Sequence, residues 1–218
     1  MRAQPQFPNE QTGTGEFKRQ SDAFRHWVTE DGRSGYPAAA GRYHLYVSLA
    51  CPWAHRTIIV RALKGLTEVI GMTVVDPIRD DQGWAFHNGP GHSLDTTNGF
   101  HFLSEAYRAT DPNYHGRVTV PVLWDTVTKR IVTNSDDDLM RIFNGEFNRF
   151  TTSRLDLYPA ALRPQIDEMN DFVYERVNDG VYRAGFATSQ QVYERAARSV
   201  FVALDQLDTR LRDRRYLF

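Results

Sequence analysis

Cys51 is the residue of this chain best suited to nucleophilic chemistry. Pro52 follows it, and because proline is favoured in the first turn of a helix, Cys51 is predicted to be a helix N-cap. The unpaired N–H groups of a helix N-terminus and the helix dipole stabilise a thiolate and lower the pKa of the thiol. His55 and Arg56 add positive charge one turn further on. Lone cysteines are usually small buried hydrophobes, but Cys-Pro at a strand-to-helix junction favours a reactive thiol.

Cys51 is the only cysteine, which excludes an internal disulfide and fits a reducing compartment. The run Cys-Pro-Trp-Ala lacks the second cysteine of a dithiol motif. A disulfide formed in turnover must therefore join Cys51 to an external thiol that binds nearby. Val120-Pro121, ahead of a predicted strand, is compatible with a cis peptide that leaves backbone groups free to pair with an extended ligand. A proline at the start of an edge strand is the alternative interpretation.

Alternating strand and helix patterns position these residues. The run at 43–47 predicts a strand, the apolar stripe from Pro52 to Leu66 a helix, and the apolar run at 68–76 a second strand buried on both faces. Together they predict a parallel βαβ unit. The later elements are predicted as a short helix at 102–109, a hairpin of strands at 118–125 and 129–134, and a helix at 139–143 that Ser135 and the following acids cap.

The domain organisation follows from where these patterns begin and end. Residues 1–41 are rich in Gly, Pro and polar residues and are predicted to form an extended arm that packs through its aromatic side chains. An α/β domain is predicted at 42–144, a linker at 145–160 and an all-α domain at 161–218, whose two helical patterns span about 159–179 and 189–215. Two helices are few for a domain core, so we expect a longer natural protein.

Composition narrows the function classes. The 218 residues are 41% hydrophobic, 12% aromatic and 24% charged, which is typical of a globular protein. The formal net charge of −1 disfavours binding to nucleic acid or to an anionic membrane. No apolar run reaches the roughly 18 to 20 residues that a membrane helix needs, and the first 20 residues are too polar for a signal peptide. We expect a soluble cytoplasmic protein.

Four segments, in order and spread over nearly the whole chain, carry a resemblance. They are Cys51 to Arg56 after Tyr46-Val47-Ser48, the tryptophan Trp84, Arg117 to Asp125, and Asn178 to Ala187. With these segments the chain resembles the Xi class of glutathione transferases, the glutathionyl-hydroquinone reductases. The resemblance implies an α/β thioredoxin-like N-terminal domain, an all-α glutathione-transferase-type C-terminal domain that is incomplete here, a long N-terminal arm, and a homodimer.

The resemblance also implies roles for residues of the α/β domain. Cys51 is the expected nucleophile, and Trp84 is expected to form an aromatic wall over the bound thiol. Val120, before Pro121, whose peptide bond is expected to be cis, is expected to pair with the cysteinyl backbone of glutathione. Arg117 is a candidate charge partner for a ligand carboxylate. The alternative for Trp84 is an ordinary core aromatic, although a loop rich in Gly and Asp is an unusual place for one.

One further role and one departure bear on the two ends of the substrate. Tyr182 is expected to donate its hydroxyl to the second substrate, with a tyrosine packed between helices as the alternative. The family has Glu-Ser ahead of the helix that follows the hairpin, where both residues hold the γ-glutamyl end of glutathione, and this chain has Ser135-Asp136 there. The serine still offers a hydroxyl, but Asp136 would repel a carboxylate and favour an amine or sugar hydroxyls.

The chemistry expected is removal of a low-molecular-weight thiol, glutathione or a different one such as mycothiol, from a thiol-conjugated hydroquinone. In this reaction Cys51 forms a mixed disulfide, and a second thiol molecule releases it. A glutaredoxin- or dehydroascorbate-reductase-like oxidoreductase and a non-catalytic binding protein are the alternatives. No required metal is expected: His87 and His92 flank Asn-Gly-Pro-Gly in a predicted loop, and no histidine pair has a zinc-binding spacing with cysteine or carboxylate support.

Overall fold

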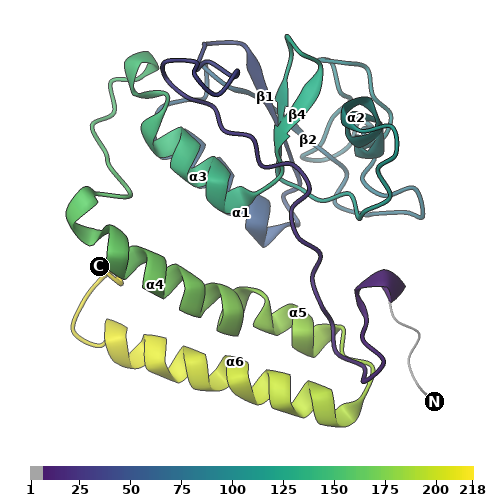
Figure 1. Ribbon diagram of the computed structural model, residues 1–218, viewed down its shortest axis with the longest axis vertical. Helices are drawn as coiled ribbons and strands as arrows, with labels where there is room; N and C mark the ends of the chain where they lie inside the picture. Colours follow the sequence, from purple (N-terminus) through teal and green to yellow (C-terminus); the bar gives the residue numbers. More distant parts are fainter. Residues whose placement is uncertain (1–6) are drawn as a thin grey trace. The chain divides into compact units, whose positions relative to one another are not determined.

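In the computed structural model of the protein, the described residues are 7–218 (Figure 1). The chain divides into two compact units. Asp22–Leu157 forms the α/β unit, and Tyr158–Phe218 forms the helical unit together with the described residues up to Ser21. The arm predicted at 1–41 is therefore shared between the units, with the division after Ser21.

A mixed sheet in the order β2-β1-β3-β4 is the centre of the α/β unit. Its strands are β1 (Tyr43–Val47), β2 (Gly71–Val74), β3 (Val122–Asp125) and β4 (Arg130–Thr133). β1 pairs in parallel with β2 and antiparallel with β3, and β3 pairs antiparallel with β4. Leu45 sits opposite Met72 on one side and Leu123 on the other, and Leu45 and Leu123 are fully buried. The predicted βαβ unit and hairpin are thus confirmed.

Helices cover both faces of this sheet. They are α1 (Pro52–Leu63), α2 (Leu103–Thr110) and α3 (Asp136–Gly145). In Figure 1, α1 and α3 lie on one side of the strands and α2 on the other, and α1 packs directly against α3. A short 3-10 turn, η2 (Asn148–Phe150), follows α3. Because α1 and α3 pack together, their N-terminal ends, which begin at Cys51 and Ser135, are neighbours.

The second strand is shorter than the apolar run at 68–76 predicts. Residues 66–70 instead form turns, in which the N–H groups of Val69 and Ile70 donate to the carbonyl of Leu66 at 3.1 and 2.9 Å. The buried guanidinium of Arg61 donates to the carbonyls of Ile70 and Thr67 at 2.8 and 2.7 Å. An arginine from the preceding helix therefore satisfies backbone groups that a strand would have paired, which is a long-range effect that the local pattern does not contain.

A buried ion pair fixes the end of the sheet next to the hairpin turn. Arg42 donates to both oxygens of the fully buried Asp125, at 2.8 and 2.7 Å. Burial alone would raise the pKa of Asp125, but the hydrogen bonds from Arg42, Thr128 and the backbone of Val127 lower it overall. The ion pair therefore joins the start of β1 to the end of β3.

The outer edge of β4 is covered by residues 24–26. Arg25 forms an antiparallel bridge with Thr133, and the N–H of His26 donates to the carbonyl of Val132 at 3.0 Å. The N–H of Phe24 donates to the side chain of Asn134 at 2.9 Å, and the N–H of Asn134 donates to the carbonyl of Phe24 at 3.1 Å. This part of the arm is thus held by sheet-like bonds rather than by aromatic packing alone.

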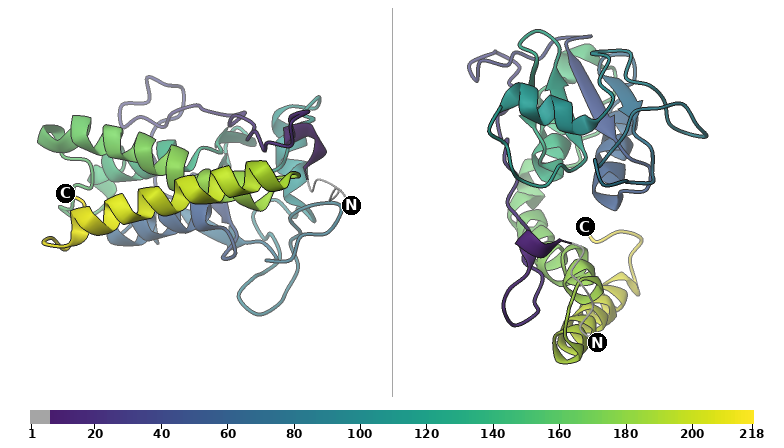
Figure 2. Two further views of the ribbon diagram at one scale, coloured as in Figure 1. Left: turned by 90° about the horizontal axis from the view of Figure 1, so that it is seen from below. Right: turned by 90° about the vertical axis from the view of Figure 1, so that its right-hand side faces the viewer.

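The helical unit contains α4 (Arg163–Val173), α5 (Gly180–Gly185) and α6 (Gln190–Leu211), and its 3-10 turns are η1 (Pro8–Glu10) and η3 (Ala160–Leu162). A π-helical turn, η4 (Tyr174–Asn178), separates α4 from α5, so the helix predicted at 159–179 is interrupted. Its mark is the bond from the N–H of Asp179 to the carbonyl of Tyr174, at 2.8 Å. Figures 1 and 2 show α4 and α5 running antiparallel to α6.

Gly180 explains how closely α5 approaches α6. A Cβ atom at this position would meet the Cγ2 of Val200 at 3.0 Å, which is tighter than ordinary packing. Glycine therefore allows the two helices to touch at the start of α5. Within the described residues, no helix is both long enough and apolar enough to span a membrane.

Candidate functional site

Cys51 is the N-cap of α1, as predicted. Its backbone is extended, at φ −102° and ψ 112°, and its carbonyl accepts the N–H of His55 at 3.0 Å. The sulfur of Cys51 is partly exposed. The first turn of α1 contains no acidic residue, so no carboxylate of this turn competes with a thiolate for the N–H groups and the helix dipole. The geometry is that of a thiol placed where an anion is stabilised.

The cis peptide between Val120 and Pro121 is also present, and it lies beside this sulfur. The thiol of Cys51 donates to the carbonyl of Val120 across 3.6 Å. The hydroxyl of Tyr107 holds the preceding residue, because it donates to the carbonyl of Thr119 at 2.9 Å and accepts the Thr119 N–H at 3.2 Å. The structure therefore brings together the two features that the sequence predicted independently, the N-cap thiol and the cis proline.

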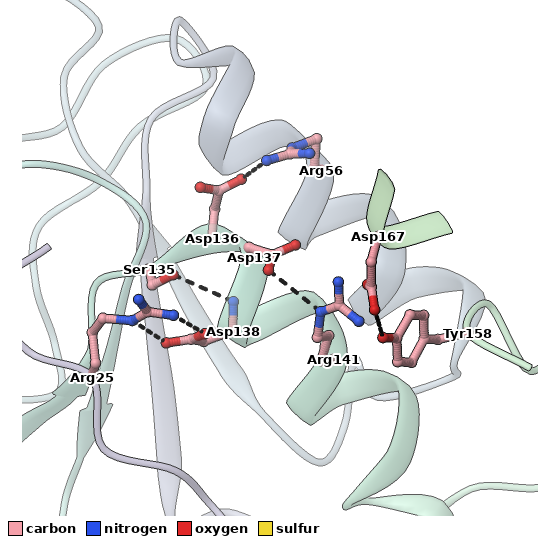
Figure 3. Close-up of polar contacts among 9 residues, drawn as sticks. All are labelled: Arg25, Arg56, Ser135, Asp136, Asp137, Asp138, Arg141, Tyr158 and Asp167. Carbon is pink, nitrogen blue, oxygen red and sulfur yellow. Dashed lines mark hydrogen bonds and ion pairs between the residues drawn. The ribbon is translucent and has the colours of Figure 1, made fainter. Parts of the chain in front are cut away.

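Ser135 is the N-cap of α3, and its hydroxyl oxygen accepts the N–H of Asp138 at 3.4 Å. The three residues that follow are all aspartates, and each is paired with an arginine (Figure 3). These ion pairs are Arg56 with Asp136, Arg25 with Asp138 and Arg141 with Asp137. The Arg25–Asp138 pair is bidentate, at 2.8 and 2.6 Å.

Arg56 links the two helix starts. It lies in α1, one turn after Cys51, and its guanidinium donates to Asp136 in the first turn of α3 (Figure 3). Asp136 is only 13% exposed, and burial raises the pKa of its carboxyl although Arg56 opposes that rise. The predicted repulsion of a ligand carboxylate by Asp136 is therefore reduced by a guanidinium that the sequence did not place there.

Asp22 is a member of this cluster that sequence reasoning missed. Burial raises the pKa of Asp22 to about 6, with further increases from Asp136 and Asp138 that outweigh the lowering by Arg25 and Ser135. By accessible surface, however, Asp22 is an exposed residue, so its direct neighbours Asp136 and Asp138 are the firmer cause of the rise. Asp22 stands in a polar stretch of the arm, where no local pattern marks one aspartate among others. It places a second carboxylate beside Ser135 and Asp136.

Trp84 lies in the long loop between β2 and α2 and is half-buried against the core. The guanidinium carbon of Arg79 lies 5.1 Å from the centroid of its ring, a cation–π distance. Burial lowers the pKa of Arg79, and repulsion from Arg117 lowers it further, which places the two guanidinium groups near each other. Arg79, which the sequence analysis did not select, therefore joins Arg117 and Trp84 in a cationic and aromatic neighbourhood.

Tyr182 belongs to the helical unit, whereas the other predicted site residues all belong to the α/β unit. Its ring stacks on Phe17 with centroids 6.3 Å apart, and the guanidinium carbon of Arg19 lies 4.2 Å from its centroid. Arg19 and Arg183 both pair with Asp179, at 2.9 and 3.0 Å. Residues of the arm thus hold the tyrosine in place. The aromatic side chains of the arm had predicted that it packs on another part of the chain, but not on which residue.

Comparison with known proteins agrees with this geometry. Residues 50–139 match the glutathione S-transferase N-terminal domain. The crystal structure of the glutathione-S-transferase Xi from Phanerochaete chrysosporium superposes with a TM-score of 0.89 at 46% identity, over 93% of this chain and 69% of that one. The chain belongs to the Xi class of glutathione transferases. The predicted family and the predicted combination of a thioredoxin-like domain with a helical domain are confirmed.

Relatives of this Xi-class chain include proteins named as reductases. Glutathionyl-hydroquinone reductase YqjG from Escherichia coli is 48% identical over 210 residues, and PcpF of the same name from Sphingobium chlorophenolicum is 44% identical over 203. The matches cover 93% of this chain but only 64% of each relative's length. A glutathione-bound structure of YqjG superposes with a TM-score of 0.87, over 89% of this chain and 66% of that one.

The α/β unit of this Xi-class chain offers three kinds of electrostatic environment. The start of α1 favours an anionic sulfur, the neighbourhood of Arg79 and Arg117 favours a carboxylate, and the start of α3 is acidic. The backbone of Val120 beside the sulfur suits an extended peptide-like ligand.

Proposed function

We propose that the chain is a thiol-dependent reductase that removes glutathione from glutathionyl-hydroquinones through a mixed disulfide on Cys51. The observation that carries the proposal is the position of Cys51 as an N-cap thiol beside the carbonyl of Val120 and the cis proline. The names of the E. coli and Sphingobium relatives support the substrate class. The absence of a second cysteine supports a mechanism in which the resolving thiol comes from solution.

The reaction needs two thiols and one proton transfer. The thiolate of Cys51 attacks the sulfur of the conjugate, so that an S–S bond forms and the bond between sulfur and the aromatic carbon breaks. That carbon keeps the bonding electron pair and takes a proton, which releases the hydroquinone. A second glutathione thiolate then attacks the mixed disulfide, which yields oxidised glutathione and restores Cys51. Over the whole cycle, the sulfur of the conjugate and the sulfur of the second glutathione each lose one electron, and these two electrons reduce the carbon.

The other predicted residues have proposed positions along the bound thiol. The backbone of Val120 pairs with the cysteinyl part of glutathione, and Trp84 lies against the bound molecule. Arg117, with Arg79 close to it, binds a carboxylate. Ser135 and Asp136 face the γ-glutamyl end, where the acidic surroundings favour its ammonium group.

Tyr182 is proposed to act on the hydroquinone. A phenol hydroxyl that donates to the hydroquinone oxygen stabilises the charge that develops when the C–S bond breaks. Arg19 above its ring and Phe17 beside it fix the orientation of the phenol. Its substitution by Phe keeps this packing and removes only the donor, so Tyr182→Phe separates a role in catalysis from a role in packing.

A second candidate keeps the reaction and changes the thiol. The carboxylates of Asp22 and Asp136 lie at the place where the family holds the γ-glutamyl end, and an acidic surface also suits the hydroxyl groups of a sugar. A low-molecular-weight thiol with a sugar head, such as mycothiol, therefore fits this end. Glutathione remains the first candidate, because its ammonium group also complements the two aspartates.

The deciding experiment measures intact protein mass after incubation with a glutathionyl-hydroquinone, together with the hydroquinone released. We expect one glutathione on the wild-type chain, stoichiometric hydroquinone, and neither product with Cys51→Ser. An adduct from the mycothiol conjugate alone would establish the second candidate. Reduction of a glutathione mixed disulfide without cleavage of the thioether would favour a glutaredoxin-like oxidoreductase, and no adduct with either conjugate would favour a binding protein.

The assembly and location expected from the sequence stay predictions. We propose a homodimer in the cytoplasm, where a free thiol such as that of Cys51 remains reduced. Light scattering during size-exclusion chromatography tests the dimer, because a monomer mass at micromolar concentration contradicts it.

A further inference from the structure

Three side chains that have no place in the thiol chemistry converge beside the end of β2. Asp76 follows the strand, and His87 and His92 flank a tight turn in the loop that leads to α2. Each offers one metal-ligating atom, and the three atoms lie within 4.8 Å of one another. The sequence showed the two histidines without a carboxylate, and the fold supplies one.

The distances suit a single ion. Nε2 of His87 lies 3.2 Å from Oδ2 of Asp76, and Nε2 of His92 lies 3.9 Å from the same oxygen. Tetrahedral bonds of about 2.0–2.1 Å place neighbouring ligand atoms about 3.3–3.5 Å apart. The imidazole rings are inclined by 73° with centroids 5.4 Å apart, so they do not stack and both can turn a nitrogen toward a common point. The separation of His92 from Asp76 must shorten by about half an ångström to reach this spacing.

Hydrogen bonds already orient two of the three ligands. Nδ1 of His92 lies 2.7 Å from the carbonyl of His87, and because a carbonyl only accepts, this nitrogen carries the proton and leaves the lone pair on Nε2. The N–H of Ile78 donates to Oδ1 of Asp76 at 2.7 Å, which leaves Oδ2 for the imidazoles. Partners of this kind fix the tautomer and direction of metal ligands in proteins.

The backbone of the turn between the two histidines packs closely against the ring of His92. The N–H and carbonyl groups of Gly89 and His92 are paired at 3.2 and 3.3 Å, and the N–H of Ser93 donates to the carbonyl of Val74 at 3.2 Å. A Cβ atom at Gly89 would overlap Nε2 of His92, so only glycine leaves room for the imidazole. The side chains of His92 and Asp76 are 8% and 13% exposed, whereas that of His87 is 56% exposed.

We propose that Asp76, His87 and His92 form a site for one divalent late first-row transition-metal ion, with Zn²⁺ as the ion used to test it. Two imidazoles and one carboxylate match the ligand preference of such ions, and the exposed side next to His87 leaves the fourth position to water. The inference does not depend on the proposed function, because none of the three residues takes part in it.

The site has a consequence for the loop that holds Trp84. Asp76 and His87 stand at the two ends of this segment, and a bond from the N–H of Asp76 to the carbonyl of Ala85, at 3.0 Å, already closes its base. A metal ion coordinated by both side chains adds a second closure at the same place. Binding of the ion therefore restrains the segment between Asp76 and His87.

Calorimetric titration with Zn²⁺ tests the site. The chain carries Cys51→Ser to remove the thiolate ligand, has no affinity tag, and is first treated with a chelator. We expect about one ion per chain, and a loss of affinity of at least about tenfold in His92→Ala, His87→Ala and the isosteric Asp76→Asn. His115→Ala, which removes an exposed histidine elsewhere, is the control and should bind as the parent does.

Thermal unfolding provides a second measurement that does not depend on calorimetric heat. Zn²⁺ should raise the Tm of the parent and of His115→Ala, and leave the Tm of His92→Ala unchanged, provided that the two variants unfold cooperatively without metal. Substoichiometric binding, undiminished affinity in Asp76→Asn and His92→Ala, or an equal loss in His115→Ala would overturn the proposal.

Discussion

The starts of α1 and α3 are neighbouring helix N-termini with opposite electrostatics. The first turn of α1 contains no acid, and its N-cap is a thiol beside the carbonyl of Val120. The first turn of α3 consists of three aspartates after a serine N-cap. Both helix ends attract anions for the same physical reason, the unpaired N–H groups and the helix dipole.

This difference between the two helix starts indicates which of them can stabilise a negative charge on a ligand. At α3 the protein's own carboxylates occupy the positive end, and arginines balance them (Figure 3). The first turn of α1 has no carboxylate of its own. The positive potential of this helix end can therefore stabilise a thiolate at Cys51 or on a sulfur bound next to it. In the proposed function, the sulfur of a bound thiol meets the anion-stabilising start of α1, and its γ-glutamyl end meets the aspartates at the start of α3.

The largest effect is expected when the ion pair between Arg56 and Asp136, which joins the two helix starts, is broken. Arg56→Gln leaves the buried Asp136 without its guanidinium and should lower the free energy of unfolding by about 1–3 kcal/mol at neutral pH. Because burial already raises the pKa of Asp136, the loss should shrink as the pH falls and the carboxyl is protonated. Urea unfolding at two pH values measures this.

A double-mutant cycle with Asp136→Asn supplies the control for that experiment. With the carboxylate removed, Arg56→Gln should cost little, since the buried charge is gone. If the two substitutions were additive, the ion pair would have no role in stability.

Restoring the family pattern at α3 should change recognition of the thiol. Ser135→Glu combined with Asp136→Ser releases Arg56 and places a hydroxyl where the family has one, so we expect glutathione to bind about tenfold more tightly. Calorimetric titration measures the Kd. Asp137→Ser, which removes a half-exposed aspartate paired only along its own helix, is the matched control. Ser135→Glu keeps a carboxylate near the proposed position of the ammonium group, so weaker binding in the double variant would contradict this expectation.

Placing an acidic residue at the start of α1, as at the start of α3, should lower the reactivity of the Cys51 thiol. His55→Asp places a carboxylate near the first turn, so the rate of Cys51 alkylation at neutral pH should fall several-fold while the free energy of unfolding rises by about 0.3–1 kcal/mol. Iodoacetamide labelling and urea unfolding of one preparation give both values. His55→Asn separates the charge from the change of shape and should leave the alkylation rate nearer that of the wild type.

The smallest effect should come from Asp22. Its pKa in the folded state, about 6, lies above the ordinary 3.8, so the folded state holds more protons than the unfolded state between these values. The free energy of unfolding should therefore decrease as the pH rises from about 4 to 6. Asp22→Asn should remove this decrease and make the protein slightly more stable than the wild type above pH 6. Identical profiles for the two proteins in thermal melts across this range would contradict the assignment.

The features predicted correctly from the sequence are those whose determinants lie within a few residues. Pro52 after Cys51 marks the start of α1, Ser135 before three aspartates marks the start of α3, and short β-rich runs mark the strands. Such signals depend on capping, turn formation and periodicity, which act locally. The position of Pro121 ahead of a strand was compatible with a cis peptide bond, and the resemblance to the family supported that prediction.

The missed features depend on contacts between distant residues. Arg56 meets Asp136 only because α1 packs on α3, and Asp22 reaches Ser135 only because residues 24–26 pair with β4. The π-helical turn interrupts a periodicity that looked continuous. Asp76 joins His87 and His92 because the loop folds back on the end of β2. For Arg56, Asp22 and Asp76, the sequence shows the residue type but not its neighbour.

The pairing of residues 24–26 with β4 also bears on how the protein avoids aggregation through the edge of its sheet. An outer strand presents a row of N–H and C=O groups that can template pairing with a second molecule. Here the bridge between Arg25 and Thr133, the bond from His26 to Val132 and the bonds between Phe24 and Asn134 occupy that row. This short segment ahead of the sheet therefore serves as a built-in guard against edge-to-edge aggregation.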